Sequence, residues 1–260
     1  MRFNRTLQKL TAGGTVFGSA MQFYPSAEIP RVFAAAGFDY FFIDLEHGIF
    51  DFQTVANLIA SAAAAGITPL VRPADLLYPL VARLLDLGAQ GIVLPRVEDP
   101  GLLREALSWM KFPPAGRRGF GVPPATLDYE RHSFPDIIQH ANENVMSVVQ
   151  FETQLSLDRA DEMLSLPGVD VAMIGPSDLS ISLGVPGEFE NPVLVKAVER
   201  FIAQCNEHGV APGIHPRSVE DAKPWIERGM RLIGVASEQA FFIERARQAR
   251  LELSAAGKQK

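Results

Sequence analysis

Residues 41–47 read FFIDLEH, and this stretch decides the fold that the sequence predicts. Its apolar start predicts a strand buried on both faces, as in a parallel sheet. The stretch then ends in three ionisable residues within four positions, Asp44, Glu46 and His47. The apolar-periodic segment 52–65 follows as a predicted helix. The sequence therefore predicts a strand–helix unit that carries acid and base groups at the carboxyl end of its strand.

The same alternation of apolar strand and amphipathic helix repeats along the chain. The predicted strands cover 15–21, 41–43, 68–71, 91–94, 146–151, 169–174, 211–214 and 232–235. The predicted helices cover 28–36, 52–65, 76–87, 100–109, 155–164, 192–208, 219–228 and 239–253. This pattern predicts a single (β/α)₈ barrel domain over residues 1–260, with an extended loop region at about 111–144 that holds a short helix near 136–142. A doubly wound open sheet is the alternative, but no glycine-rich dinucleotide fingerprint or phosphate-binding loop follows a strand, which favours the barrel.

The composition is typical of a water-soluble enzyme that acts on small molecules. The chain has 47% hydrophobic and 21% charged residues and a net charge of −6, and its basic residues are scattered. Nucleic acid and anionic membrane surfaces are therefore disfavoured as partners. The single cysteine, Cys205, excludes a disulfide within the chain and fits a reducing compartment. With no leader pattern and no apolar run of about 18 residues, we expect a cytoplasmic protein.

Ionisable residues lie where the predicted strands end. Groups just past the carboxyl ends of barrel strands converge on one mouth, whatever their separation in sequence. Glu152 and Asp178 are a natural pair for Mg²⁺ or Mn²⁺, because these hard cations prefer carboxylate oxygens. Alternatively, Glu152 caps its helix and Asp178 pairs with an arginine. Their joint placement at strand ends favours the metal.

An anion site is also predicted at this mouth. Gly175 and Ser177 leave backbone N–H groups open where a helix begins, a position that favours a carboxylate or phosphate. Arg72, at the end of the third strand, can grip the same anion through its planar fork of donors. Alternatively, Arg72 only forms a salt bridge with a neighbouring carboxylate.

His47 is the candidate for proton transfer, because it stands beside carboxylates and histidine titrates near neutral pH. Asp44 and Asp86 are candidates to orient it, although Asp86 can equally be a solvated helix charge. His215 also ends a strand, in GIHPRS, and has no assigned role. No lysine follows a predicted strand, so metal-assisted enolate chemistry is favoured over a lysine Schiff base.

Six stretches resemble the metal-dependent class II pyruvate aldolases of the HpcH/HpaI type, which include 4-hydroxy-2-oxoheptanedioate and 2-keto-3-deoxy sugar-acid aldolases. The stretches are AGFDYFFIDLEHG at 36–48, PLVRP at 69–73, GAQGIVLPRV at 88–97, FPPAGRRGFG at 112–121, VVQFET at 148–153 and GVDVAMIGPSDLSISLG at 168–184. The resemblance implies a (β/α)₈ barrel of the phosphoenolpyruvate/pyruvate-binding superfamily. It also implies a homohexamer, a trimer of dimers, with exchanged C-terminal helices.

The resemblance further implies the site and the reaction. Mg²⁺, Mn²⁺ or Co²⁺ is held by Glu152 and Asp178, and the enzyme reversibly cleaves 4-hydroxy-2-oxo acids to pyruvate and an aldehyde. Arg72 binds the keto oxygen, and His47, backed by Asp44 and Asp86, moves protons through a metal-bound water. The substrate-binding residues that the resemblance implies are Arg72, Gln150, Gly175, Pro176, Ser177 and Asp178, with the pyruvate carboxylate held at the backbone of the last two.

Three segments depart from the family pattern, and these are expected to contact the aldehyde. They are AMQFYP at 20–25, VPPATLDY at 122–129, and ASEQAFF at 236–242, where Glu238 lies. The departures keep open a citrate-forming condensing enzyme or a CoA-thioester lyase of the same superfamily. A non-catalytic oxo-acid or metal binder is a third interpretation.

Overall fold

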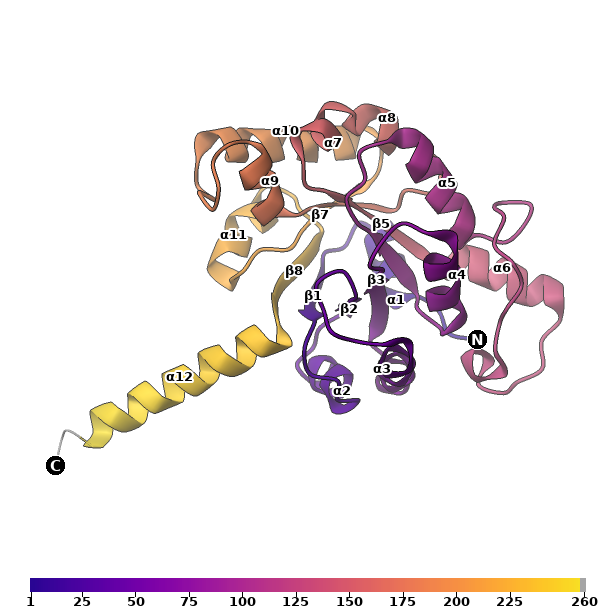
Figure 1. Cartoon of the computed structure of the whole chain (residues 1–260), viewed down its shortest axis with the longest axis horizontal. Coiled ribbons are helices and arrows are strands. Elements are labelled where there is room, and N and C mark those ends of the chain that lie inside the picture. The colour runs from indigo at the N-terminus through magenta and orange to yellow at the C-terminus, as the bar shows by residue number, and fades with distance from the viewer. Residues whose placement is uncertain (258–260) are drawn as a thin grey trace.

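Eight parallel strands form a closed barrel in the computed structural model, which describes residues 1–257 (Figure 1). The strands are β1 (Val16–Met21), β2 (Tyr40–Asp44), β3 (Thr68–Arg72), β4 (Gly91–Leu94), β5 (Met146–Phe151), β6 (Val171–Ile174), β7 (Ala211–Ile214) and β8 (Leu232–Ser237). Each strand pairs with its neighbours in sequence, and β8 pairs with β1. The predicted (β/α)₈ barrel is confirmed, and an open sheet is excluded by this closure.

Helices ring the barrel (Figure 1). They are α1 (Arg5–Thr11), α2 (Glu28–Ala35), α3 (Phe52–Ala65), α4 (Tyr78–Asp86), α5 (Pro100–Met110), α6 (Phe134–Asn144), α7 (Gln154–Asp158), α8 (Ala160–Leu164), α9 (Pro176–Ser182), α10 (Pro192–Glu207), α11 (Val219–Glu227) and α12 (Glu238–Gly257). The helix predicted over 155–164 is in fact two, because Arg159 leaves helical geometry, with φ −104° and ψ 13°. Its guanidinium bonds Glu98 O and the Asp99 carboxylate. The short helix α1 was not predicted.

The barrel interior is filled by side chains from alternate strand positions, as the two-residue period of a strand requires. Tyr40 and Phe42 of β2 and Leu70 of β3 belong to this inner cluster, and Arg72 lies one inward position further along β3. Tyr40 is 1% exposed, and Gly18 of β1 makes room for its ring. The alternation that packs the interior therefore also directs the last inward residue of each strand to the mouth.

The segment 122–129 lies away from that mouth, and helix α12 starts at the mouth but runs away from it. The segment 122–129, with the short 3₁₀ helix η1 (Pro124–Leu127), folds back so that Thr126 packs against Gly88, just after α4. Helix α12 extends away from the barrel (yellow in Figure 1). Among residues 1–257, no helix is long and apolar enough to cross a membrane.

The contact between Gly18 and Tyr40 gives a stability prediction. A Cβ at position 18 would lie 2.4 Å from Tyr40 Cζ, so Gly18→Ala must displace a buried ring. We expect the free energy of unfolding to fall by about 1–3 kcal/mol, the usual cost of overpacking a core. Urea denaturation measures the change. Gly257→Ala, where a Cβ meets nothing within 4 Å, is the control, and equal urea midpoints for the two variants would contradict the packing argument.

Candidate active site

The carboxyl ends of seven strands surround a cavity of about 530 Å³ at the mouth of the barrel. Its lining includes Gln22, His47, Arg72, Gln150, Asp178 and His215. These residues are far apart in sequence, and the parallel barrel brings them together because every strand points the same way. The structure thus places most of the residues predicted from strand ends around one cavity.

Asp44 is the centre of the polar network beneath this cavity. It is fully buried, and its two oxygens accept hydrogen bonds from Arg72 Nε at 2.9 Å and Arg72 Nη2 at 2.6 Å. Gln22 Nε2 donates to the same carboxylate at 2.7 Å, and the backbone N–H groups of Glu46 and His47 donate at 3.0 and 3.3 Å. Asp44 was predicted to orient the His47 imidazole, but it binds the His47 backbone and fixes the Arg72 guanidinium.

The protonation states of this pair follow from burial and pairing. Burial alone would raise the pKa of Asp44, but the hydrogen bonds and charge of Arg72, with the Gln22 bond, hold that pKa below its ordinary value. Burial alone would lower the pKa of Arg72, but Asp44 and then Glu46 raise it. Both groups therefore stay charged at neutral pH.

The Arg72 guanidinium keeps one N–H group for a ligand. Two of its five N–H groups bind Asp44, and Nη1 lies 3.2 Å from Gln150 Oε1 and 3.1 Å from Glu46 Oε2. The second N–H of Nη2 is left over by this count. Arg72 thus forms the salt bridge of the alternative interpretation, but it also keeps a donor beside the cavity.

Glu152 lies 5% exposed just after β5, among other carboxylates. Gln150 Nε2 donates to its Oε2 at 2.5 Å, and the backbone N–H of Arg96 donates to its Oε1 at 3.1 Å. Burial raises the pKa of Glu152, and the charges of Asp178 and Glu46 raise it further. Negative charge is therefore in excess around Glu152.

The donor set fits a hard divalent cation. Glu152 and Asp178 supply oxygen ligands. The buried Glu46 Oε2 forms an ion pair with Arg72 Nη1 at 3.1 Å but accepts no well-aligned hydrogen bond within residues 1–257. Gly175 lies against the Glu152 carboxylate, since a Cβ there would come 3.0 Å from Glu152 Oε2. In the described part of the chain, no three His, Cys, Asp or Glu side chains form a ready metal cluster. A cation at Glu152 and Asp178 would thus take its other ligands from water or substrate.

His47 and His215 face the same cavity, but they differ in how exposed they are to solvent. His47 is exposed at the rim. His215 packs edge-on against Phe42, with ring centroids 5.1 Å apart, and its Nε2 lies 2.9 Å from the Ala236 carbonyl oxygen, to which it donates. Burial lowers the pKa of His215 to about 4, so its imidazole is neutral at neutral pH. Gly234 is required beside it, because a Cβ there would lie 1.9 Å from His215 Nδ1.

Glu238 does not contact the cavity in the way expected of the acceptor site. It is 5% exposed, and its carboxylate accepts hydrogen bonds from three successive backbone N–H groups, those of Gln22, Phe23 and Tyr24, at 2.6 to 3.1 Å. Glu238 therefore anchors the loop after β1 to the start of α12. Gln22, which this loop positions, lines the cavity instead.

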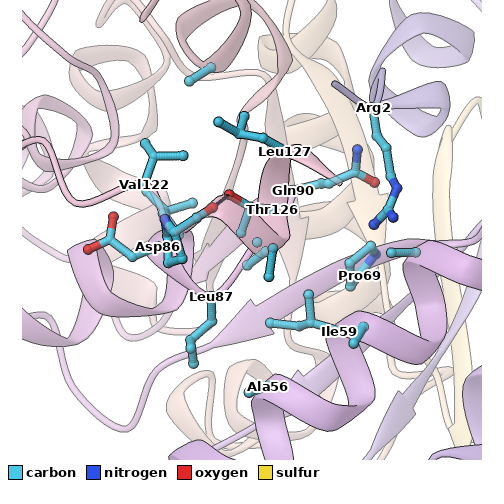
Figure 2. Close-up of a pocket in the computed structure, with 18 of the residues that line it drawn as sticks. Arg2, Ala56, Ile59, Pro69, Asp86, Leu87, Gln90, Val122, Thr126 and Leu127 are labelled. Carbon is cyan, nitrogen blue, oxygen red and sulfur yellow. Dashed lines mark hydrogen bonds between the residues drawn. The ribbon is translucent and has the colours of Figure 1, made fainter. Parts of the chain in front are cut away.

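Asp86 is the predicted site residue that the structure does not bring to the mouth. It ends α4, which runs back along the barrel, so it lies toward the opposite rim and lines a second cavity of about 590 Å³ with Val122 and Thr126 (Figure 2). There it accepts a hydrogen bond from Arg118 Nη2 at 2.7 Å. The interpretation that Asp86 orients His47 within one chain is wrong, and so is the placement of 122–129 beside this chain's aldehyde site.

Two polar residues at the mouth were not singled out from the sequence, although Gln22 belongs to the segment 20–25 that was expected to contact the aldehyde. Gln22 follows β1 directly, and Arg217 follows β7 within GIHPRS. Both obey the rule that residues after a barrel strand face the mouth, so strand ends alone were enough to find them.

The family comparison agrees with this geometry. A family model described as HpcH/HpaI aldolase/citrate lyase matches residues 20–244. The 4-hydroxy-2-oxo-heptane-1,7-dioate aldolase of Escherichia coli is 35% identical over 205 residues, which cover 79% of this chain and 78% of that protein. The 2-dehydro-3,6-dideoxy-6-sulfogluconate aldolase of Pseudomonas putida is 31% identical over 223 residues, 86% of this chain and 87% of that protein.

Solved structures show the same similarity. The HpcH/HpaI aldolase from Desulfitobacterium hafniense DCB-2 matches with a TM-score of 0.92 and 29% identity, and the match covers 97% of both chains. The citrate synthase SbnG matches with a TM-score of 0.85 and 27% identity, over 98% of both chains. The chain therefore belongs to the HpcH/HpaI aldolase/citrate lyase family and is a carbon–carbon lyase.

Proposed function

We propose that the protein is a class II aldolase that reversibly cleaves 4-hydroxy-2-oxo acids to pyruvate and an aldehyde. The observation that carries this proposal is the Arg72 guanidinium, fixed by Asp44, in one cavity with Asp178 and beside the Glu152 carboxylate. The Arg72 guanidinium can stabilise negative charge that develops on a keto oxygen, and the two carboxylates can hold a cation that does the same.

The 2-oxo acid binds between these groups. The free N–H of Arg72 donates to the keto oxygen, and this bond strengthens as the oxygen becomes negative. The backbone of Ser177 and Asp178 holds the substrate carboxylate, beside Gly175 and Pro176. Gln150 forms hydrogen bonds with both Arg72 and Glu152, so it fixes the position of the guanidinium relative to the carboxylate.

Glu152 and Asp178 hold a divalent cation, for which Mg²⁺, Mn²⁺ and Co²⁺ are the candidates. When bound, the cation supplies Lewis acidity for enolate formation. Its positive charge would also offset the repulsion from Asp178 and Glu46, which adds to the effect of burial in raising the pKa of Glu152.

His47 moves the protons. In cleavage it accepts the proton of the C4 hydroxyl, the C3–C4 bond breaks, and its electron pair passes into the pyruvate enolate while the aldehyde leaves. Protonation of C3 then gives pyruvate. The exposure of His47 lets it exchange protons with solvent between these two steps.

A condensing enzyme is the second candidate, favoured by the similarity to the citrate synthase SbnG. Such an enzyme would use the same enolate site with oxaloacetate or an acyl-CoA. Turnover of oxaloacetate with an acyl-CoA, in the absence of pyruvate release from 4-hydroxy-2-oxo acids, would favour it over the aldolase.

We also propose that the chain assembles as a homohexamer with exchanged C-terminal helices and is cytoplasmic. Helix α12 supports the assembly, because it leaves the barrel with Phe242, Leu251 and Leu253 each at least 65% exposed. Apolar side chains in such numbers on one exposed helix are typical of an interface.

The function is tested by pyruvate release from a panel of 4-hydroxy-2-oxo acids, coupled to lactate dehydrogenase. We expect turnover with Mg²⁺ or Mn²⁺ and none with EDTA. Glu152→Gln should abolish turnover and the metal-induced rise in stability, which for the wild type is about 2.7 kcal/mol at a metal concentration of 100 Kd. The exposed Glu143→Gln is the control. Turnover that EDTA does not affect, or no turnover with any substrate, would contradict the proposal.

Arg72→Lys tests whether turnover needs the several N–H donors of the Arg72 guanidinium or only its positive charge. Lysine keeps the charge but cannot donate to both Asp44 oxygens and to the keto oxygen, so kcat should fall by about 10²- to 10³-fold. Arg159→Lys, which changes an arginine paired with Asp99 and Glu162, is the matched control. Steady-state kinetics give the result, and similar kcat values for the two variants would argue against this role of Arg72.

Asp44→Asn tests the buried ion pair through the pH dependence of stability. Because the folded-state pKa of Asp44 is lowered, its stabilisation is present above the unfolded-state pKa, near 4, and is lost as pH falls through the folded value. At pH 7 the variant should lose about 3–5 kcal/mol, the usual cost of breaking such a pair. The difference should shrink below about pH 4. Urea unfolding from pH 7 to 2 measures this difference in the free energy of unfolding, and the exposed Asp158→Asn is the control. A difference that stays constant with pH would refute the lowered pKa of Asp44.

A further inference from the structure

Arg217 is a cation of the mouth that has no acidic partner within residues 1–257. It follows β7, lines the mouth cavity and is exposed. Its Nη2 lies 3.5 Å from Ser177 Oγ, the outer limit of a hydrogen bond, and its Cζ lies 5.4 Å from the centre of the Phe189 ring. Arg72, the other arginine of the lining, in contrast has two acidic partners, Asp44 and Glu46.

Asp221, which lines a small pocket together with Arg217, already has a hydrogen-bond partner of its own. Asp221, in the first turn of α11, accepts a hydrogen bond from Ser218 Oγ at 2.8 Å and returns one through its backbone N–H at 3.1 Å. Phe189 holds the Arg217 guanidinium by a cation–π contact, which orients the fork without cancelling its charge. The fork is thus placed to bind an anion from solution.

The depth of the cavity indicates which end of a substrate Arg217 meets. Arg72, Gln150 and Glu152 are at most 8% exposed and form the inner end of the site. Arg217, like His47, is exposed at the rim. A 2-oxo acid anchored at the inner end would extend its other end toward the rim.

We propose that Arg217 is a specificity-determining residue that binds an anionic group at the far end of the acceptor aldehyde. The inference rests on the proposed aldolase function and narrows the acceptor to aldehydes that carry a terminal carboxylate or sulfonate. Because the bond between Arg217 and the anionic terminus is exposed to solvent, we expect it to raise kcat/KM by only about tenfold over a neutral terminus.

Kinetics on matched substrates test this proposal. The first pair is 4-hydroxy-2-oxoheptanedioate and its terminal amide. The second pair is a 4-hydroxy-2-oxo acid with a terminal sulfonate and one of equal length with a terminal alcohol. Arg217→Gln should lower kcat/KM for both anionic substrates by about tenfold, mainly through KM, and leave the neutral ones unchanged. The matched control is Arg228→Gln, because Arg228 also stacks on an aromatic ring, Trp225, but pairs with Glu199 outside the mouth. A loss only with the carboxylate or only with the sulfonate names the group that the fork prefers.

Equal losses on anionic and neutral substrates would overturn the proposal, because Arg217 would then serve the 2-oxo acid end that all substrates share. Binding separates this result from failure of the aldolase proposal. Calorimetric titration of the Mn²⁺-loaded wild type with 2-oxoadipate and with 2-oxohexanoate should show about tenfold tighter binding of the dianion, and Arg217→Gln should remove the difference. A wild-type preference without any turnover refutes the aldolase and keeps the anion site. Equal affinities in the wild type refute the anion site, whatever the turnover.

Discussion

The buried carboxylate of Asp44 is the interaction on which the mouth of the barrel depends. An isolated carboxylate at this depth would cost several kcal/mol of desolvation. Here the cost is offset by five hydrogen bonds, from the Arg72 fork, the Gln22 side chain and two backbone N–H groups of its own strand end. The bonds join the ends of β1, β2 and β3. The Arg72 guanidinium is consequently held in one orientation before any ligand binds, and such preorganisation is what transition-state stabilisation requires.

Glu238 extends this network to the last strand of the barrel. Three successive N–H groups at residues 22–24 have no strand partner, and the buried Glu238 carboxylate satisfies all of them. That anchor fixes the backbone from which Gln22 reaches Asp44. The first and eighth strands are therefore joined at the mouth by side chains as well as by the sheet. Within the segment 236–242, which departs from the family sequence, Glu238 thus supports the loop beneath the cavity, whereas Ala236, Ser237 and Ala240 line the cavity itself.

Sequence predicted the barrel and most of the mouth because buried parallel strands are apolar on both faces, so charged residues such as Arg72 and Glu152 stand out at their ends. It failed where the outcome depends on side-chain partners or on helix direction. Asp86 was grouped with His47 by residue type, but α4 carries it toward the opposite rim. Asp44 was predicted to contact the His47 imidazole, but its carboxylate binds the His47 backbone and the Arg72 guanidinium, a choice that sequence spacing cannot show.

Charged groups at the inner end of the mouth are few, and the buried His215 adds no charge to them because its imidazole is neutral. Asp44 balances the charge of Arg72. Glu152 has other carboxylates around it, and burial first, then the charges of Asp178 and Glu46, raise its pKa. A protonated His215 beside Arg72 would cancel some of this negative charge and weaken the attraction for a cation. Burial prevents that by lowering the pKa of His215 to about 4. His215 therefore adds polarity but no charge, so at the inner end of the site the charged groups that a divalent cation and a 2-oxo acid would meet are the carboxylates and Arg72.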